Sequence, residues 1–372
     1  MRIGLLGYGW IARAHAHALL TLDHMAPLRR RIELVALAGR NAERAAAFAA
    51  ELGFARSTTR WQEVVDADDV DVVGIATPVE AHAEAAAASL RAGKPTLCEK
   101  PLGLDAAESG ELADLAADAG VTNAVGFNYR YIPAVALARQ LVESGRLGAV
   151  RHFRGLYLQD FKAAGAPSRT THGGASAVLD YIHLADMLLF LGGEPVSLQA
   201  QTSRFVSATD DHFAAVLELR GGGSATLEAS RVALGWKGRE RIELNGADGS
   251  LWWNLEDPNR LHVYLAGDER DRLAGFRDVL VTNPDHPFLE SWWPPGHVLG
   301  WEHALVHQWR DFLIAALDGA PVPARQASFE DGRRAAVVAD AIAASADEGR
   351  RVELDFFTQQ ARPRMEETAG LR

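Results

Sequence analysis

A glycine-rich turn near the start of the chain has the features of a dinucleotide-binding site. The apolar run Ile3–Leu6 leads into Gly7-Tyr8-Gly9-Trp10-Ile11-Ala12, which opens a helical pattern over residues 11–22. The first glycine permits a tight turn, the second lets the backbone approach a pyrophosphate, and the small Ala12 permits close packing of helix on strand. The free N–H groups and positive dipole end of the helix then attract the phosphates. At the first strand–helix junction of the chain, this turn predicts dinucleotide binding.

The residues after the second predicted strand bear on which dinucleotide is bound. The strand at residues 34–38 leads into Gly39-Arg40-Asn41, with no carboxylate where one would bind the ribose 2′-hydroxyl of NAD. Arg40 could bind the 2′-phosphate of NADP through two hydrogen bonds, or it could be an ordinary solvated arginine beside a helix N-cap. We expect NADP or NAD as the cofactor, with NADP favoured.

Two further groups of residues have the types needed for acid–base chemistry. Glu99-Lys100-Pro101 follows the fourth predicted strand, at the sheet edge where open α/β sheets bind ligands. Asp180, His183 and Asp186 recur at i, i+3 spacing in a helical pattern and share roughly one face. A carboxylate one turn from a histidine can orient the imidazole and make it a base that is usable near neutral pH. On spacing alone, a polar stripe at a domain interface is the simpler interpretation.

The elements that position these residues alternate through the first third of the chain. Predicted strands lie at residues 3–6, 34–38, 70–76, 95–98 and 122–126, and predicted helices lie between them at residues 11–22, 41–52, 80–92 and 105–119. This alternation predicts an α/β fold, a doubly wound parallel sheet of the Rossmann type with helices on both faces. We expect this NAD(P)-binding domain to span residues 1–126.

After Gly126 the pattern changes to alternating polar and apolar runs separated by turn signals such as Gly221-Gly222-Gly223. Such runs indicate an α+β domain with a large, mostly antiparallel open sheet, which we expect to span residues 127–357. Residues 358–372 are polar and aperiodic, so we expect a flexible tail. The predicted strands are 150–159, 196–202, 212–219, 225–232, 239–244, 250–254 and 261–265, and the predicted helices are 133–144, 177–191, 302–317 and 329–348.

Composition excludes several classes of protein. The 372 residues carry a formal net charge of −11, which argues against a dedicated nucleic-acid binder. A single cysteine, Cys98, cannot form an intrachain disulfide, and no apolar run approaches the roughly 18 residues of a membrane span. We expect a soluble, cytoplasmic protein that binds no metal, no nucleic acid and no membrane.

Taken together, these motifs resemble the glucose–fructose oxidoreductase, inositol dehydrogenase and MocA family over essentially the whole chain. Within it, the levoglucosan (1,6-anhydroglucose) dehydrogenase group looks closest, because of Gly126-Phe127-Asn128-Tyr129-Arg130 and Tyr157-Leu158-Gln159-Asp160. The family matches are Gly7-Tyr8-Gly9-Trp10-Ile11-Ala12 with His15, Ala76-Thr77-Pro78 with His82, Glu99-Lys100-Pro101, and Gly173-Gly174 leading to Asp180, His183 and Asp186.

The resemblance implies an NAD(P)-dependent oxidoreductase that takes hydride from a secondary hydroxyl of a sugar, glycoside, anhydrosugar or cyclitol. Lys100 would hydrogen-bond the reacting hydroxyl and His183 would accept its proton, with Asp180 beside the histidine. Many members place this aspartate four residues before the histidine, where this chain has Leu179. The implied cofactor-binding residues are Gly7, Tyr8, Gly9, Trp10, Ile11, Ala12, Gly39, Arg40, Asn41, Thr77, Pro78, His82, Glu99, Lys100, Pro101 and Asn128.

A polyhydroxylated substrate needs hydrogen-bonding groups and aromatic faces around it. The stretch 161–173 is short and lacks the Trp-Arg pair expected in the anhydrosugar group, of which only Arg169 remains. The Trp292-Trp293 segment is either a lid over the substrate or a packing element. Our substrate-site candidates are Lys100, Asn128, Tyr129, Arg130, Tyr157, Gln159, Arg169, His172, Asp180 and His183.

Two other functions remain open from the sequence. A redox-cycling glycosidase or lyase would act through a 3-keto intermediate and return the hydride, so it would turn over without net cofactor reduction. A non-catalytic, cofactor-sensing regulator would not need Lys100 and His183.

The second predicted sheet also bears on assembly. Leu227, Trp252, Trp253 and Tyr264 lie in its strands and suggest apolar side chains left for another surface, which would be a liability if unpaired. We expect a homodimer or homotetramer formed through this sheet.

Overall fold

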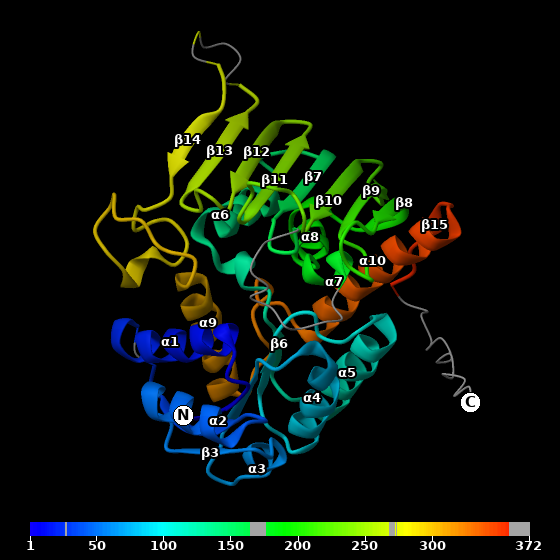
Figure 1. Ribbon diagram of the computed structural model, residues 1–372. Coiled ribbons are helices and arrows are strands. Elements are labelled where there is room, and N and C mark those ends of the chain that lie inside the picture. Colours follow the sequence, from blue (N-terminus) through cyan, green and yellow to red (C-terminus); the bar gives the residue numbers. More distant parts are fainter. Residues whose placement is uncertain (27, 164–175, 268–271, 273, 357–372) are drawn as a thin grey trace, which may run out of the picture.

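Six parallel strands form the first sheet of the computed structural model, in the order β3-β2-β1-β4-β5-β6 (Figure 1). The structure describes residues 1–26, 28–163, 176–267, 272 and 274–356. The predicted doubly wound parallel sheet is confirmed, whereas the short β3 was missed because its residues, Arg-Ser-Thr, form no apolar run. The strands are β1 (Arg2–Leu6), β2 (Glu33–Ala38), β3 (Arg56–Thr58), β4 (Val72–Ile75), β5 (Thr96–Cys98) and β6 (Asn123–Val125).

Helices cover both faces of this sheet, and one of them comes from far along the chain. The helix α9 (His303–Asp318) comes late in the sequence but packs beside α1, and its fully buried Trp309 lies against Gly74 of β4. The first layer therefore depends on a late segment. With α9 on one face are α1 (Trp10–Met25) and α2 (Ala42–Leu52), and on the other are α3 (Gln62–Val65), α4 (His82–Arg91) and α5 (Ala106–Ala119).

Nine strands form the second sheet, in the order β14-β13-β12-β11-β7-β10-β9-β8-β15. Neighbouring strands run antiparallel except β7 and β10, which are parallel, so the predicted mostly antiparallel sheet is confirmed. The strands are β7 (Val150–Leu158), β8 (Pro195–Ser203), β9 (His212–Leu219), β10 (Ser224–Ser230), β11 (Arg239–Gly246), β12 (Gly249–Asn254), β13 (Arg260–Leu265), β14 (Arg277–Leu280) and β15 (Val352–Glu353).

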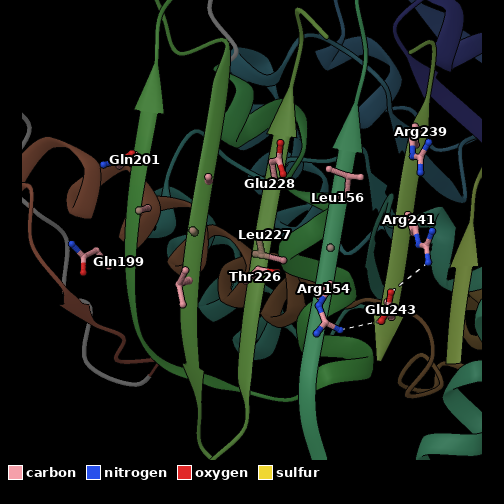
Figure 2. A pocket seen from close by; sticks show the side chains of 15 residues that line it. Arg154, Leu156, Gln199, Gln201, Thr226, Leu227, Glu228, Arg239, Arg241 and Glu243 are labelled. Carbon is pink, nitrogen blue, oxygen red and sulfur yellow. Dashed lines mark hydrogen bonds and ion pairs between the residues drawn. The ribbon is translucent and has the colours of Figure 1, made fainter. Parts of the chain in front are cut away.

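In the described part of the chain, helices cover one face of this sheet and leave the other open (Figure 1). The helix α10 (Phe329–Glu348) packs against both β8 and α5, so it joins the two layers. A depression of about 940 Å³ lies on the open face, where Figure 2 shows Arg154, Leu156 and Arg241 among the side chains that line it. The other covering helices are α6 (Pro133–Glu143), α7 (Ala177–Asp180) and α8 (His183–Met187).

Of the four side chains predicted to form an apolar surface on this sheet, two are instead buried against the helices. Leu227 and Trp253 each expose 1% of their surface and face the helices, because strand alternation puts them in phase with the buried residues. Trp252 and Tyr264 alternate to the other face and are half-buried there.

The predicted continuous helix at residues 177–191 is also wrong. The helix α7 ends at Asp180, α8 begins at His183, and a π-helical turn, Leu188–Gly192, follows. A contact to the sheet stabilises the break between α7 and α8, because the Tyr181 hydroxyl donates to the backbone oxygen of Ser230. Local periodicity carries no signal of such a long-range contact.

Two kinds of feature are absent from the residues whose positions are described. No helix combines the length and apolar character needed to cross a bilayer. No group of three or more His, Cys, Asp or Glu side chains could hold a metal ion.

A buried ion-pair cluster ties the segment between the two sheets to the helices of the second layer. Arg130 lies in the 3₁₀ turn Asn128–Tyr131 (η2) and is 2% exposed. Its Nε and Nη2 donate to the carboxylate of the fully buried Asp186, and Nη2 also donates to Asp331 of α10. Arg130 therefore makes a structural contact rather than standing free for substrate.

Replacement of Asp186 by Asn should lower the free energy of unfolding by about 3–5 kcal/mol, because a buried guanidinium would lose its main counter-charge. Urea denaturation measures the loss. In the matched control, Glu143→Gln breaks the exposed Arg139–Glu143 pair on α6 and should cost less than about 1 kcal/mol. Equal costs for the two variants would contradict this role.

Candidate active site at the junction of the two sheets

Lys100 connects the first sheet to the helices under the second. It follows β5 at the carboxyl edge of the parallel sheet, and its Nζ donates to the backbone oxygen of Asp180 at 2.9 Å. Asp180 is the last residue of α7. The ammonium group is thereby held at the junction of the two layers, and Lys100 lies at the sheet edge predicted from the sequence.

A series of buried hydrogen bonds fixes the backbone at Lys100. Trp309 Nε1 donates to His15 Nδ1 at 2.9 Å, so the neutral ring carries its proton on Nε2. That Nε2 lies 2.9 Å from Glu99 Oε1 and donates to it. Glu99 Oε2 accepts the backbone N–H of Lys100 at 3.0 Å. Helices α1 and α9 therefore position the lysine through Glu99.

His82 holds the same turn from the other side. Its two ring nitrogens lie 2.8 Å from the backbone oxygen of Pro101 and 2.9 Å from that of Thr77. Burial lowers the pKa of His82 below its usual value. The two backbone oxygens oppose this lowering. The ring lies between the turns at Thr77 and Pro101, and in its neutral form it donates to one of these two oxygens at a time.

His183 is buried among aromatic rings. Its ring stacks on Tyr129 with centroids 4.2 Å apart and meets the edge of Phe127. Among the described residues, Nδ1 has no hydrogen-bond partner. Burial, and then the charge of Lys100, lowers the pKa of His183 well below its usual value. The imidazole is therefore neutral at neutral pH and has a lone pair that can accept a proton.

The expected pairing of His183 with a carboxylate is not present. The carboxylate of Asp180 accepts a hydrogen bond from Arg231 Nη1 at 3.0 Å, and Asp186 is bound by Arg130. Both carboxylates therefore bind arginines and do not orient the imidazole of His183, which is the role that their spacing suggested. Desolvation and the nearby Lys100, rather than a neighbouring aspartate, determine the protonation state of His183.

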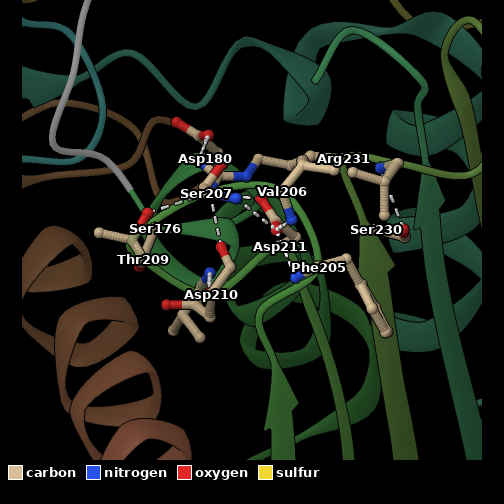
Figure 3. Close-up of polar contacts among 12 residues, drawn as sticks. Ser176, Asp180, Phe205, Val206, Ser207, Thr209, Asp210, Asp211, Ser230 and Arg231 are labelled. Carbon is tan, nitrogen blue, oxygen red and sulfur yellow. Dashed lines mark hydrogen bonds and ion pairs between the residues drawn. The ribbon is translucent and has the colours of Figure 1, made fainter. Parts of the chain in front are cut away.

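Arg231 itself is held by the loop between β8 and β9, as Figure 3 shows. Its Nη2 donates to the backbone oxygen of Asp210 at 2.6 Å and to Asp211 Oδ1 at 3.3 Å. Asp211 Oδ2 in turn accepts three successive backbone N–H groups, those of residues 205–207. The loop therefore holds the guanidinium of Arg231 in place, and Arg231 holds the carboxylate of Asp180. The backbone oxygen of Asp180 in turn holds the ammonium group of Lys100.

The remaining substrate candidates divide into three groups. The hydroxyls of Tyr129 and Tyr157 lie 3.0 Å apart, and the ring of Tyr129 stacks on His183. Asn128 is buried with Nδ2 unpartnered among the described residues. Gln159 donates instead to the backbone oxygen of Lys237. Arg169 and His172 lie outside the described residues.

The glycine turn has the geometry that a dinucleotide requires. Gly7 has φ = 115°, and a Cβ there would lie 2.3 Å from the backbone oxygen of Ala76. At Gly9 a Cβ would meet nothing within 4 Å, so this side of the turn is open. The helix α1 has neither a side-chain cap nor an acidic residue in its first turn. Its N–H groups are therefore available to a phosphate, and Ile11 and Ala12 follow in that first turn.

The other cofactor candidates lie around this turn. Trp10 is 68% exposed and pairs with Trp301, with ring centroids 5.8 Å apart. Gly39 leaves room for the Tyr8 ring, and a Cβ there would overlap it. Asn41 is committed to capping α2 through the N–H of Arg44. Beside Pro78, the hydroxyl of Thr77 is buried without a partner among the described residues. These unpartnered polar atoms and the open turn fit a dinucleotide.

Two buried residues of the second layer, Arg231 and Glu240, were not predicted from the sequence as candidates. Arg231 follows β10 with no pattern that distinguishes it from a surface arginine. Glu240 is fully buried on β11. It alternates with the buried Ile242 and Leu244 on the same face of the strand. A carboxylate at a position predicted to be buried was the sequence signal that could have identified Glu240.

Comparison with protein families matches both halves of the chain. Residues 1–127 match a model described as an oxidoreductase family with an NAD-binding Rossmann fold, and residues 135–252 match the GFO/IDH/MocA C-terminal domain. The chain belongs to the Gfo/Idh/MocA oxidoreductase family. It is therefore an oxidoreductase of an NAD-binding family, as the resemblance implied.

Relatives in this family match along the full length. Levoglucosan dehydrogenase of Pseudarthrobacter phenanthrenivorans is 33% identical over 93% of this chain and 96% of its own. Inositol 2-dehydrogenase of Rhizobium meliloti is 29% identical over 95% of this chain and 99% of its own. A solved structure of levoglucosan dehydrogenase with NADH and levoglucosan superposes with a TM-score of 0.90 and 34% identity, over 95% of this chain and 99% of that one.

The protonation state of His183 can be tested directly. Histidine side-chain ¹⁵N NMR, with His183→Asn to identify the resonance, should show a neutral ring at pH 7. Lys100→Met should raise the pKa of His183, because a nearby positive charge is removed. Lys94→Met, which removes an ammonium group bound to the backbone oxygen of Ala67, should leave it unchanged. A protonated His183 at pH 7 would contradict the proposed electrostatics.

Proposed function

We propose that this protein oxidises a secondary hydroxyl of a sugar, anhydrosugar or cyclitol, with NAD or NADP as hydride acceptor. The observation that carries the proposal is the hydrogen bond from Lys100 Nζ to the backbone oxygen of Asp180 at 2.9 Å, which holds the lysine at the turn that leads into His183. The charge of Lys100 contributes to the lowered pKa of the histidine. The names of the full-length relatives, levoglucosan dehydrogenase and inositol 2-dehydrogenase, support the substrate class.

The two side chains have complementary roles in such an oxidation. The neutral imidazole of His183 accepts the proton of the reacting hydroxyl, and the ammonium of Lys100 stabilises the negative charge that develops on its oxygen. When bound, the nicotinamide accepts the hydride. Tyr129 holds the imidazole plane by stacking, and Asp180 is a positioning residue that acts through its backbone oxygen.

Purified protein, mixed with NAD⁺ or NADP⁺ and a panel that includes levoglucosan and myo-inositol, should form reduced nicotinamide in proportion to the polyol consumed. Because general acid–base groups contribute about 10²–10⁴-fold, Lys100→Met and His183→Ala should each lower turnover by that range, with cofactor affinity little changed. Lys94→Met is the matched control and should keep parental turnover. Parental turnover in either site variant would contradict the assignment, and turnover without net cofactor reduction would favour the redox-cycling alternative.

Arg40 supports a preference for NADP over NAD. It is exposed at the carboxyl end of β2, with no hydrogen bond or ion pair to any described residue. A charge-assisted hydrogen bond to the 2′-phosphate is worth roughly 1.5–3 kcal/mol, or about ten- to a hundredfold in affinity. Fluorescence titration should show tighter binding of NADPH than NADH, and Arg40→Ala should remove the difference. Equal or tighter NADH binding by the parent would contradict this preference.

The open face of the second sheet supports assembly into a homodimer or homotetramer. Val216 of β9 is 61% exposed on this face, and Leu156 and Trp252 lie half-buried on the same face. Light scattering at micromolar concentration should give a multiple of the chain mass, and Val216→Glu should shift it towards the monomer, because a charge would be buried. Leu20→Glu, on the surface of α1, should not. A monomeric parent would rule out this assembly.

A further inference from the structure

Glu240 carries a fully buried carboxyl group that forms no side-chain hydrogen bond with any described residue. Glu240 is 0% exposed, and neither Oε1 nor Oε2 has a hydrogen-bond partner among the described residues. A buried polar group without a partner costs free energy, and a buried charge costs more. The fold therefore maintains an unfavourable group at this position, and nothing in the packing of the second layer explains it.

The position of Glu240 on the sheet directs it towards the junction. It is the second residue of β11 and pairs with Tyr157, near the carboxyl end of β7. Arg231, which holds Asp180, follows the neighbouring end of β10. Glu240 alternates with the buried Ile242, so it faces the helix side of the sheet rather than the open face.

Electrostatic coupling places Glu240 with the catalytic groups. Burial raises the pKa of Glu240 well above its usual value, and the charge of Lys100 opposes this rise. Burial and then the charges of neighbours, Glu240 among them, raise the pKa of Tyr129 and Tyr157. The carboxyl group thus lies within the electrostatic range of Lys100, of Tyr129, which stacks on His183, and of Tyr157, which pairs with Glu240 across the strands.

The two unpartnered oxygens of Glu240 indicate which kind of ligand could supply their missing hydrogen bonds. In its ionised form a carboxylate has two oxygens that only accept hydrogen bonds, so it matches two adjacent hydroxyl donors on one molecule. Such hydrogen bonds, together with the charge of Lys100, favour the ionised form against the effect of burial. We propose that Glu240 is a specificity-determining residue that accepts hydrogen bonds from two neighbouring hydroxyls of a polyol, beside the hydroxyl engaged by Lys100 and His183. This inference rests on the proposed function and narrows its substrate to compounds with a vicinal diol next to the oxidised carbon.

If Glu240 binds substrate, its replacement should weaken substrate binding without lowering the stability of the free protein. A residue kept for packing stabilises the free protein, whereas a residue kept for ligand binding leaves the free protein less stable than it could be. Glu240→Gln keeps the shape and removes the charge, and Glu240→Leu fills the site with an apolar side chain. Both variants should therefore have a thermal midpoint equal to or above that of the parent.

Steady-state kinetics with the panel polyol that the parent oxidises best test the binding role. Loss of hydrogen bonds to a charged group should raise KM about ten- to a hundredfold in both variants. The dissociation constant for reduced cofactor should stay unchanged, and kcat should fall by less than the rise in KM. Glu243→Gln, three residues further on β11 and facing the open side of the sheet, is the matched control and should keep the parental KM.

Deoxy derivatives of the same polyol identify the hydroxyls that Glu240 binds. In the parent, removing one hydroxyl beside the reacting carbon should raise KM about tenfold or more, and in Glu240→Leu the same removal should cost much less. The inference is overturned if both variants keep KM within about twofold of the parent, or if the deoxy penalty is unchanged in Glu240→Leu. A parent that oxidises no polyol contradicts the proposed function as well, so the two failures are distinguishable.

Discussion

The hydrogen bond from Lys100 Nζ to the backbone oxygen of Asp180 crosses from the first layer of the protein to the second, and the candidate site depends on it. A flexible lysine can stabilise developing charge only if its ammonium group is held in place. Each end of this bond has its own support. Trp309, His15 and Glu99 fix the backbone at Lys100, and Arg231 fixes Asp180.

The buried polar side chains differ in whether their polar atoms have hydrogen-bond or ion-pair partners. Arg130 is satisfied by two carboxylates, and Asp211 accepts three backbone N–H groups, so both stabilise the fold around the site. His183 and Glu240 are equally buried but keep unpartnered polar atoms among the described residues. Since a buried unpaired group is costly, the unpaired atoms of His183 and Glu240 support the proposal that a ligand completes them.

The sequence predicts the first layer well because its signals are local. The apolar strand before Gly7, the glycine turn and the position of Lys100 after β5 each follow from neighbouring residues. The contacts that shape the site are long-range: Arg130 binds Asp186 and Asp331, 56 and 201 positions away, and Trp309 binds His15 across 294. Strand and helix periodicity cannot predict such pairings. For that reason the spacing of Asp180 and His183 suggested a pair that the structure replaces with Arg231.

In the proposed function, hydride passes at this junction from a carbon that bears a hydroxyl group to a nicotinamide. The most direct test uses levoglucosan or myo-inositol, whichever the protein oxidises, deuterated at its ring carbons, and mass spectrometry of the reduced cofactor after turnover. One deuterium is expected in each reduced nicotinamide formed. Reduced cofactor without deuterium, or consumption of the polyol with no reduced cofactor formed, would contradict it.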